Sequence, residues 1–177
     1  MAADTARRSL VIVFTGKGKG KTTAALGILL RAWGRGLRVV MLSFIKAQTS
    51  NYGEHRAARK MGVEIIPLGA GYTWLSKDIE KDKAMARQCW ELAREKIASG
   101  QYDVVILDEF TYPVSFGWLP VVEVIEFLRD RPQGVNVVIT GCDAPPPLIE
   151  LADLVTEMQA VKHPYDENVH ALPGIDF

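Results

Sequence analysis

Short apolar runs alternate along the chain with longer segments in which apolar residues recur at helical spacing. The runs that we expect to form buried strands lie at 10–14, 38–44, 63–67, 104–107, 135–140 and 154–161. The segments that we expect to form helices lie at 22–35, 54–61, 77–99, 120–131 and 148–152. This alternation is typical of an α/β fold, in which helices cover both faces of a mostly parallel sheet.

The same pattern bears on how the chain divides into domains. We find no internal repeat, low-complexity linker or charge block that would separate two domains, so residues 10–177 are expected to form a single domain. Residues 1–9 precede the first strand and are expected to form a flexible N-terminal segment. The stretch 69–76 shows no sustained period and is expected to be an ordered loop.

Composition and charge narrow the possible partners. Lys plus Arg and Asp plus Glu both number 21, so no net field favours nucleic acid or an anionic membrane, and any anion site must be local. The two cysteines, Cys89 and Cys142, form neither a zinc pattern nor a disulfide framework. No segment approaches the ~20 apolar residues that span a bilayer. We therefore expect a cytoplasmic protein with neither a nucleic-acid nor a membrane partner.

A glycine- and lysine-rich loop, 16–22, lies between the first strand and the first helix. Such a loop suits a triphosphate, because its N–H groups turn inward and the helix N-terminus adds positive potential. Lys21 is expected to bind phosphate oxygens, and the Thr22 hydroxyl to bind Mg²⁺ or Mn²⁺. The expected ATP-binding residues are Thr15, Gly16, Lys17, Gly18, Lys19, Gly20, Lys21, Thr22 and Thr23. An exposed Gly/Lys-rich turn is the alternative, and the flanking strand and helix disfavour it.

The loop departs from the general phosphate-binding pattern, Gly, four residues, then Gly-Lys-Ser/Thr, because Thr15 stands where the first glycine falls. A second acidic motif, Asp108-Glu109, follows the apolar strand 104–107. Carboxylates at the C-terminal end of a neighbouring parallel strand face the same crevice as the loop, and one of them is expected to hold magnesium. These features alone permit a kinase, an ATPase, a switch or a transferase.

Further motifs follow the loop in a fixed order. They are Phe44-Ile45-Lys46 with Gly53-Glu54, Gly71-Tyr72-Thr73-Trp74, Leu107-Asp108-Glu109 with Thr111-Tyr112, Ile139-Thr140-Gly141, Ala152 to Met158, Lys162-His163-Pro164 and Gly174-Ile175-Asp176-Phe177. From about Leu10 to Phe177 the chain thereby resembles the P-loop family of ATP:cob(I)alamin, or corrinoid, adenosyltransferases. The resemblance accounts for Thr15, since the family loop reads T-G-x-G-K-G-K-T-T.

The resemblance implies a reaction. Such enzymes transfer the 5′-deoxyadenosyl group of ATP to the Co(I) centre of a reduced corrinoid, form a Co–C bond and release triphosphate, in adenosylcobalamin biosynthesis or salvage. The nucleotide is held in reverse relative to other P-loop enzymes. The acceptor is cobyrinic acid a,c-diamide, cobinamide or cobalamin, and the family also implies a homodimer and an electron donor such as a reduced flavoprotein. The alternatives are a P-loop ATPase or small-molecule kinase that cleaves the γ-phosphate, and a carrier without catalysis.

The resemblance also assigns residues. It implies that Lys21 binds the triphosphate, that Thr22 and Glu109 bind magnesium, and that Asp108 supports them from beside the metal. Lys46 and Glu54 match family positions near the nucleotide or substrate entrance, although a solvated pair is nearly as good an interpretation of each. Tyr72 and Trp74 match aromatics that lie against the corrin and displace its lower axial ligand, in place of ordinary loop packing.

One position departs from the family. After Thr140-Gly141 the family has Arg, whereas this chain has Cys142. Loss of that cation implies either weaker ATP binding or compensation by Lys17 or Lys19, and Cys142 itself is interpreted as a passive substitution.

Overall fold

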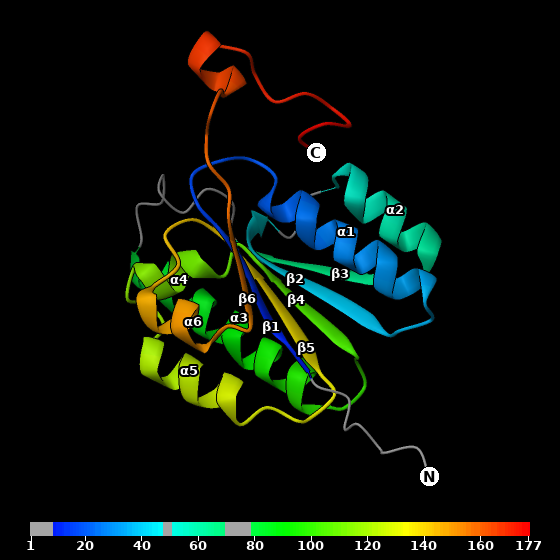
Figure 1. Cartoon of the computed structure of the whole chain (residues 1–177), viewed down its shortest axis with the longest axis vertical. Coiled ribbons are helices and arrows are strands. Elements are labelled where there is room, and N and C mark those ends of the chain that lie inside the picture. The colour runs from blue at the N-terminus through cyan, green and yellow to red at the C-terminus, as the bar shows by residue number, and fades with distance from the viewer. Residues whose placement is uncertain (1–8, 48–50, 70–78) are drawn as a thin grey trace.

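The computed structural model describes residues 9–47, 51–69 and 79–177. Six strands form one sheet in the order β3-β2-β4-β5-β1-β6, and every neighbouring pair is parallel (Figure 1). The strands are β1 (Val11–Thr15), β2 (Val39–Ala47), β3 (Glu64–Gly69), β4 (Val104–Asp108), β5 (Asn136–Thr140) and β6 (Leu154–Glu157). The α/β class expected from the alternating pattern is therefore confirmed.

Helices cover both faces of this sheet. They are α1 (Lys21–Gly34), α2 (Gly53–Met61), α3 (Ile79–Ala98), α4 (Thr111–Ser115), α5 (Val121–Arg129) and α6 (Pro146–Leu151), with a 3₁₀ turn, η2 (Pro164–Glu167). Helices α1 and α2 lie on one face, and α3, α5 and α6 lie on the other (Figure 1). Successive strand residues point to opposite faces, so in β4 Val105 packs with α3 and α5 while Ile106 packs with α1.

Some elements differ from the sequence pattern. The strand expected at 154–161 ends at Glu157, and the extension to 161 is wrong, because the backbone of Met158 bonds the glycine-rich loop and Val161 is 88% exposed. Helix α4 and the turn η2 were not expected, since each spans too few residues to show a period. Helix α6 begins at Pro146, two residues early, because proline is tolerated in a first helical turn.

The strand order brings three strand ends together. Strand β1 leads into the glycine-rich loop, β4 ends at Asp108, and β5, which lies between them, ends at Thr140. In a parallel sheet all three C-terminal ends meet at one edge, which is where α/β proteins bind ligands. The loop, the carboxylates and a threonine between them therefore share one site.

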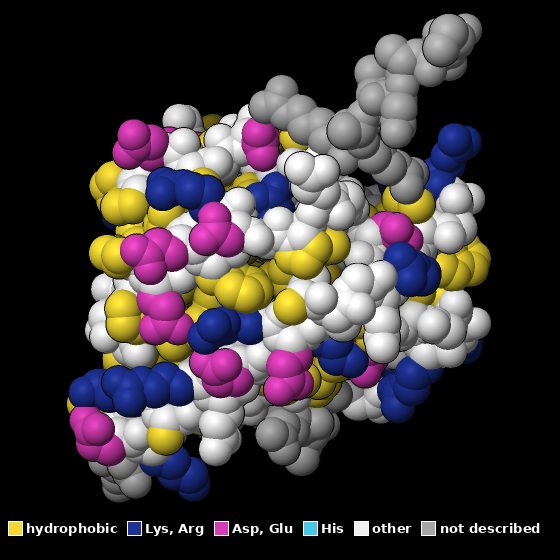
Figure 2. Space-filling model, turned by 90° about the horizontal axis from the view of Figure 1, so that it is seen from below, with side chains coloured by type: hydrophobic (Ala, Val, Ile, Leu, Met, Phe, Trp, Pro, Cys, Tyr) yellow, Lys and Arg dark blue, Asp and Glu magenta, His cyan; other side chains and the backbone are white. Residues whose placement is uncertain are grey.

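The end of the sheet opposite these three strand ends has a surface of mixed charge (Figure 2). Figure 2 views the molecule from that side, and Lys, Arg, Asp and Glu side chains are interspersed there with apolar ones. Such a mixed face matches the equal numbers of acidic and basic residues and gives no single-sign patch in the part that is described. Within the described ranges, no helix has the length and apolar character needed to cross a membrane.

Candidate active site

The glycine-rich loop makes its sharp turns at two residues with positive φ. Gly16 has φ 95°, and a Cβ atom there would lie 2.4 Å from the carbonyl oxygen of Met158. Gly20 has φ 107° and is the N-cap of α1, where no side chain of the described residues caps the helix. The first N–H groups of α1 therefore point at an open position, which is the arrangement that binds phosphate.

The segment after β6 supports this loop. The N–H of Gly18 donates to the carbonyl of Met158 at 2.7 Å, and the N–H of Met158 donates to the carbonyl of Thr15 at 2.8 Å. The hydroxyl oxygen of Thr15 accepts a hydrogen bond from the N–H of Ala144 at 3.1 Å. Thr15 thus ties the loop to the segment after β5, while Gly16 makes the turn. This explains how the loop forms without glycine at position 15.

Lys21 places its charge over the loop backbone. Its Nζ donates to the carbonyl oxygens of Gly16 at 2.8 Å and Gly18 at 2.7 Å. Both acceptors belong to the glycine-rich loop, so the ammonium adds positive charge beside the uncapped N-terminus of α1. An ammonium in this position is suited to bind phosphate oxygens.

Asp108 lies at the centre of the site and is fully buried. Its Oδ1 accepts hydrogen bonds from the hydroxyls of Thr22 at 2.8 Å and Thr140 at 2.7 Å. The next residue, Glu109, has φ 60°, and its N–H donates to the Thr140 hydroxyl oxygen at 2.8 Å. Burial, reinforced by the charge of Asp108, raises the pKa of Glu109 to about 7.

Two carboxylate oxygens in this cluster are suited to a metal ion. Asp108 Oδ2 and Glu109 Oε2 are buried, and neither has a hydrogen-bond partner among the described residues. A buried carboxylate oxygen without a donor costs free energy, which a divalent cation offsets. The described part of the chain has no group of three or more His, Cys, Asp and Glu residues that forms an all-protein metal site. The residues therefore fit Mg²⁺ that shares its remaining positions with phosphates and water.

Lys46 and Glu54 belong to the same cluster. Lys46 Nζ lies 2.9 Å from Glu54 Oε1 and 3.5 Å from Asp108 Oδ2. Burial opposes the charge of Lys46, but Asp108 and Glu54 outweigh it and raise its pKa. Burial likewise opposes ionisation of Glu54, yet the hydrogen bond from Lys46 lowers its pKa. The pair is therefore a half-buried link from β2 and α2 to the carboxylates, and the interpretation as a solvated loop pair is wrong.

Sequence reasoning assigned no role to Thr140, which joins both carboxylate residues. Replacing Thr140 by Val keeps its shape but removes one donor to Asp108 and the acceptor of the Glu109 N–H. We expect Thr140→Val to lower the free energy of unfolding by about 1–3 kcal/mol, as measured by urea denaturation. Thr156→Val, on the exposed strand β6, is the matched control and should change it by less than about 0.5 kcal/mol. An equal effect of both changes would contradict this role of Thr140.

Two cavities flank the loop. The first, about 510 Å³, lies between α1 and α2, and Thr22, Thr23, Lys46, Glu54 and Glu109 form its polar part. The second, about 490 Å³, is lined by residues on the other side of the loop: Thr15, Gly16, Lys17, Asp143, Ala144, Ile149, Glu157, Met158, Gln159 and Ala160. The expected site residues within the described ranges thus come together around the loop and these two cavities.

The C-terminal residues 174–177 were noted in the sequence only as a motif. In the structure they line the first cavity, and Asp176 forms an ion pair with Lys19 of the loop. Lys19 and Asp176 are 157 residues apart in the sequence. Their spacing gives no periodic signal, so the sequence pattern does not reveal this contact.

Cys142, the departure from the family, lies beside α4. Its sulfur accepts a hydrogen bond from the Tyr112 hydroxyl at 3.3 Å, and its carbonyl accepts one from the Thr111 hydroxyl at 2.6 Å. Cys142 lines neither cavity. These contacts are those of a packing residue and support a passive substitution. Tyr72 and Trp74 lie outside the described residues.

Comparison with known proteins identifies the family. The family model "ATP:corrinoid adenosyltransferase BtuR/CobO/CobP" matches residues 7–177. The chain is 43% identical to the corrinoid adenosyltransferase of Escherichia coli K12, over 96% of this chain and 86% of that protein. It is 42% identical, with the same coverage, to the corrinoid adenosyltransferase CobA of Salmonella typhimurium.

A solved structure shares the fold. The flagellar accessory protein FlaH of Methanocaldococcus jannaschii superposes with a TM-score of 0.54 at 14% identity, over 84% of this chain and 70% of that one. The family match extends over nearly the whole sequence and includes both the phosphate loop and the carboxylate cluster. The chain therefore belongs to the ATP:corrinoid adenosyltransferase family.

Proposed function

We propose that this protein transfers the 5′-deoxyadenosyl group of ATP to the Co(I) centre of a reduced corrinoid and releases triphosphate. The observation that carries the proposal is the junction of the phosphate loop with two buried carboxylate oxygens that have no hydrogen-bond donor among the described residues, Asp108 Oδ2 and Glu109 Oε2, in a chain of this family. Such a junction binds a metal–triphosphate, and the family membership distinguishes adenosyl transfer from cleavage of the γ-phosphate.

The reaction needs charge stabilisation more than proton transfer. The cobalt electron pair forms the bond to the ribose 5′ carbon, and the C5′–O bond breaks with its electrons on the triphosphate. The α1 N-terminus and the Lys21 ammonium then stabilise the charge that grows on the leaving group. No side chain has to act as nucleophile or base, so the protein works by positioning and electrostatics.

Mg²⁺, when bound, supplies further stabilisation of the triphosphate charge. We propose that Thr22 and Glu109 hold it and that Asp108 orients Thr22 by the 2.8 Å hydrogen bond. Lys46, 3.5 Å from Asp108, then keeps the carboxylate cluster from carrying excess negative charge beside the phosphates. The buried oxygen Glu109 Oε2, which has no hydrogen-bond donor among the described residues, supports this assignment.

The adenosyl group is proposed to occupy the first cavity. Thr22 and Glu109 at its polar part adjoin the leaving group, and Leu26, Ala57 and Met61 give it an apolar part suited to a base. This places the nucleoside on the α2 side of the loop, and the second cavity adjoins the far end of the triphosphate. The arrangement agrees with a nucleotide held in reverse.

The remaining family expectations stay proposals. Tyr72 and Trp74 are proposed to lie against the corrin and displace its lower ligand. An electron donor such as a reduced flavoprotein is proposed to supply the electron that reduces Co(II) to Co(I). We also propose a homodimer. We expect Trp74→Ala to spare transfer to chemically prepared Co(I) while impairing reduction of bound Co(II), in parallel anaerobic assays of the two steps. Equal losses in both assays would argue against this role.

One assay tests the proposed function. The protein is incubated anaerobically with MgATP and hydroxocobalamin reduced by titanium(III), and both products are measured. We expect a light-sensitive adenosylcorrinoid, identified by its absorption spectrum, and triphosphate in equal molar amounts. Formation of ADP and phosphate would instead show a kinase or ATPase, and binding without a cobalt–carbon bond would show a carrier.

A further inference from the structure

The last residues of the chain form a compact turn, 172–177, which we call the C-terminal strap. Within it the N–H of Asp176 donates to the carbonyl of Leu172 at 2.9 Å, and the N–H of Gly174 donates to the carbonyl of Phe177 at 2.8 Å. Asp176 Oδ2 also accepts from the N–H of Leu172 at 2.7 Å. These local bonds give the strap a defined shape, so its side chains are presented in fixed directions.

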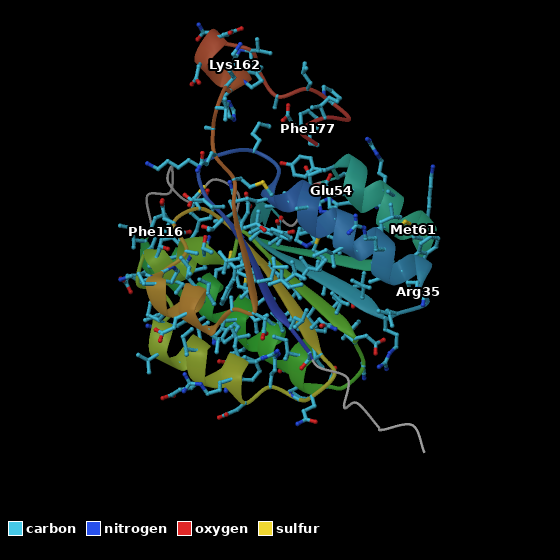
Figure 3. The ribbon with its side chains drawn as sticks, viewed as in Figure 1. Arg35, Glu54, Met61, Phe116, Lys162 and Phe177 are labelled. Carbon is cyan, nitrogen blue, oxygen red and sulfur yellow. The ribbon has the colours of Figure 1, made fainter. Side chains whose placement is uncertain are left out.

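The strap is attached at both sides of the first cavity. On one side, Asp176 forms its ion pair with Lys19 of the phosphate loop. On the other, the Phe177 ring lies 5.8 Å from the Tyr52 ring, centroid to centroid, and the backbone of Phe177 approaches Gly53 at the start of α2. Figure 3 shows Phe177 at the same end of the molecule as Glu54 of α2. The strap therefore bridges the loop and α2.

This bridge makes the strap a wall of the cavity. Residues Gly174 to Phe177 line the same space as Thr22 and Glu109 at its polar part and Leu26 and Met61 at its apolar part. Its volume of about 510 Å³ lies within the roughly 300–1,000 Å³ typical of small-molecule sites. An aromatic ring at the edge of an apolar space is suited to stack against a planar base.

We propose that the C-terminal strap is the lid of the nucleoside cavity, that Phe177 is a specificity-determining residue for the base of the nucleotide, and that Asp176 is a positioning residue that acts through Lys19. The proposal rests on the proposed function, because it takes the first cavity as the place of the adenosyl group. It gives Lys19 a role that the loop motif does not: holding the strap closed.

The charges are consistent with a closed lid. A carboxylate beside the phosphate loop would repel the triphosphate, but the Lys19 ammonium pairs with it. The hydrogen bond from Lys19 lowers the pKa of Asp176, so its carboxylate stays charged at neutral pH. Lys19 is thus engaged by the strap, whereas Lys17 lines the second cavity and is the lysine that we assign to compensate for Cys142.

The test compares two ligands of the full chain. ATP fills both the loop and the nucleoside cavity, whereas inorganic triphosphate fills the loop alone. We expect Phe177→Ala to weaken MgATP binding about tenfold in calorimetric titration, through loss of the aromatic contact and its apolar area, and to leave magnesium–triphosphate binding unchanged. Asp176→Asn should also weaken MgATP but leave triphosphate binding unchanged or tighter. The conservative variants Phe177→Tyr and Asp176→Glu should bind MgATP with nearly the wild-type affinity.

Phe116→Ala is the matched control. Phe116 is half-exposed like Phe177 but lies beside α4, far from the strap in Figure 3, and should leave the affinities for both ligands unchanged. The proposal that the strap is a lid would be overturned if Phe177→Ala left the ATP affinity unchanged. It would also be overturned if this variant lost affinity for ATP and for triphosphate equally. Failure of the proposed function is separate, because it would appear in the wild-type product assay as ADP in place of adenosylcorrinoid.

Discussion

Replacing Lys21 with Ala is expected to lower kcat/KM for ATP by on the order of 10²–10³-fold, because the side chain acts where charge develops on the leaving triphosphate. Its Nζ already lies over the loop, bonded to the carbonyls of Gly16 and Gly18, so little rearrangement is needed to meet phosphate oxygens. An interaction that strengthens as the C5′–O bond breaks affects kcat together with kcat/KM. Steady-state rates of adenosylcobalamin formation from Co(I) measure both.

The matched control for this change is Lys60→Ala. Lys60 is exposed on α2 and lines neither cavity, so its loss should leave kcat/KM within about twofold of wild type. Lys21→Arg keeps the charge but replaces a compact ammonium with a planar fork, and it should recover only a small part of the rate. A rise in KM with unchanged kcat in Lys21→Ala would show that Lys21 serves binding and not the leaving group.

Replacing Glu109 with Gln is expected to stabilise the metal-free protein at pH 8 while abolishing most of its activity. The pKa of Glu109 is raised from 4.5 to about 7 by burial and by Asp108. The native state therefore holds this proton more tightly than the unfolded state, and stability is lost as pH rises from 4.5 through 7. A shift of this size corresponds to about 3 kcal/mol above pH 7, and Gln does not ionise.

Urea denaturation in EDTA at pH 5 and pH 8 measures this effect. We expect the stability advantage of Glu109→Gln over wild type to be about 2–3 kcal/mol larger at pH 8 than at pH 5. Adding Mg²⁺ and ATP should stabilise wild type far more than the variant, because the variant has lost a metal ligand. Glu126→Gln, exposed on α5, is the matched control for the loss of one carboxylate. A variant that is no more stable than wild type at pH 8 would contradict the cost of ionising Glu109.

Much of this fold follows from local pattern. The strands are Val- and Ile-rich runs and the helices carry apolar stripes, so their existence is encoded within short windows of sequence. The phosphate loop and the Asp108-Glu109 pair were placed correctly at one edge, because parallel strands bring their C-terminal ends together. The roles of these residues and of Tyr72 and Trp74 remain predictions.

What the sequence did not reveal depends on contacts between distant segments. The role of Thr140 requires the order β4-β5-β1, which periodicity does not determine. Met158 ends β6 early because its backbone bonds the loop, a contact between residues about 140 positions apart. The sequence did not decide whether Lys46 belongs to the site or to a solvated pair, and only its burial beside Asp108 places it in the carboxylate cluster.

The position of β1 in the sheet has a consequence for how the protein is made. This strand is synthesised first, yet its neighbours are β5 and β6, which emerge from the ribosome more than a hundred residues later. The phosphate loop that follows it acquires its support from Met158 later still. Nucleotide therefore has no finished loop to bind while the chain is growing, and capacity to bind ATP arises in the last stage of folding.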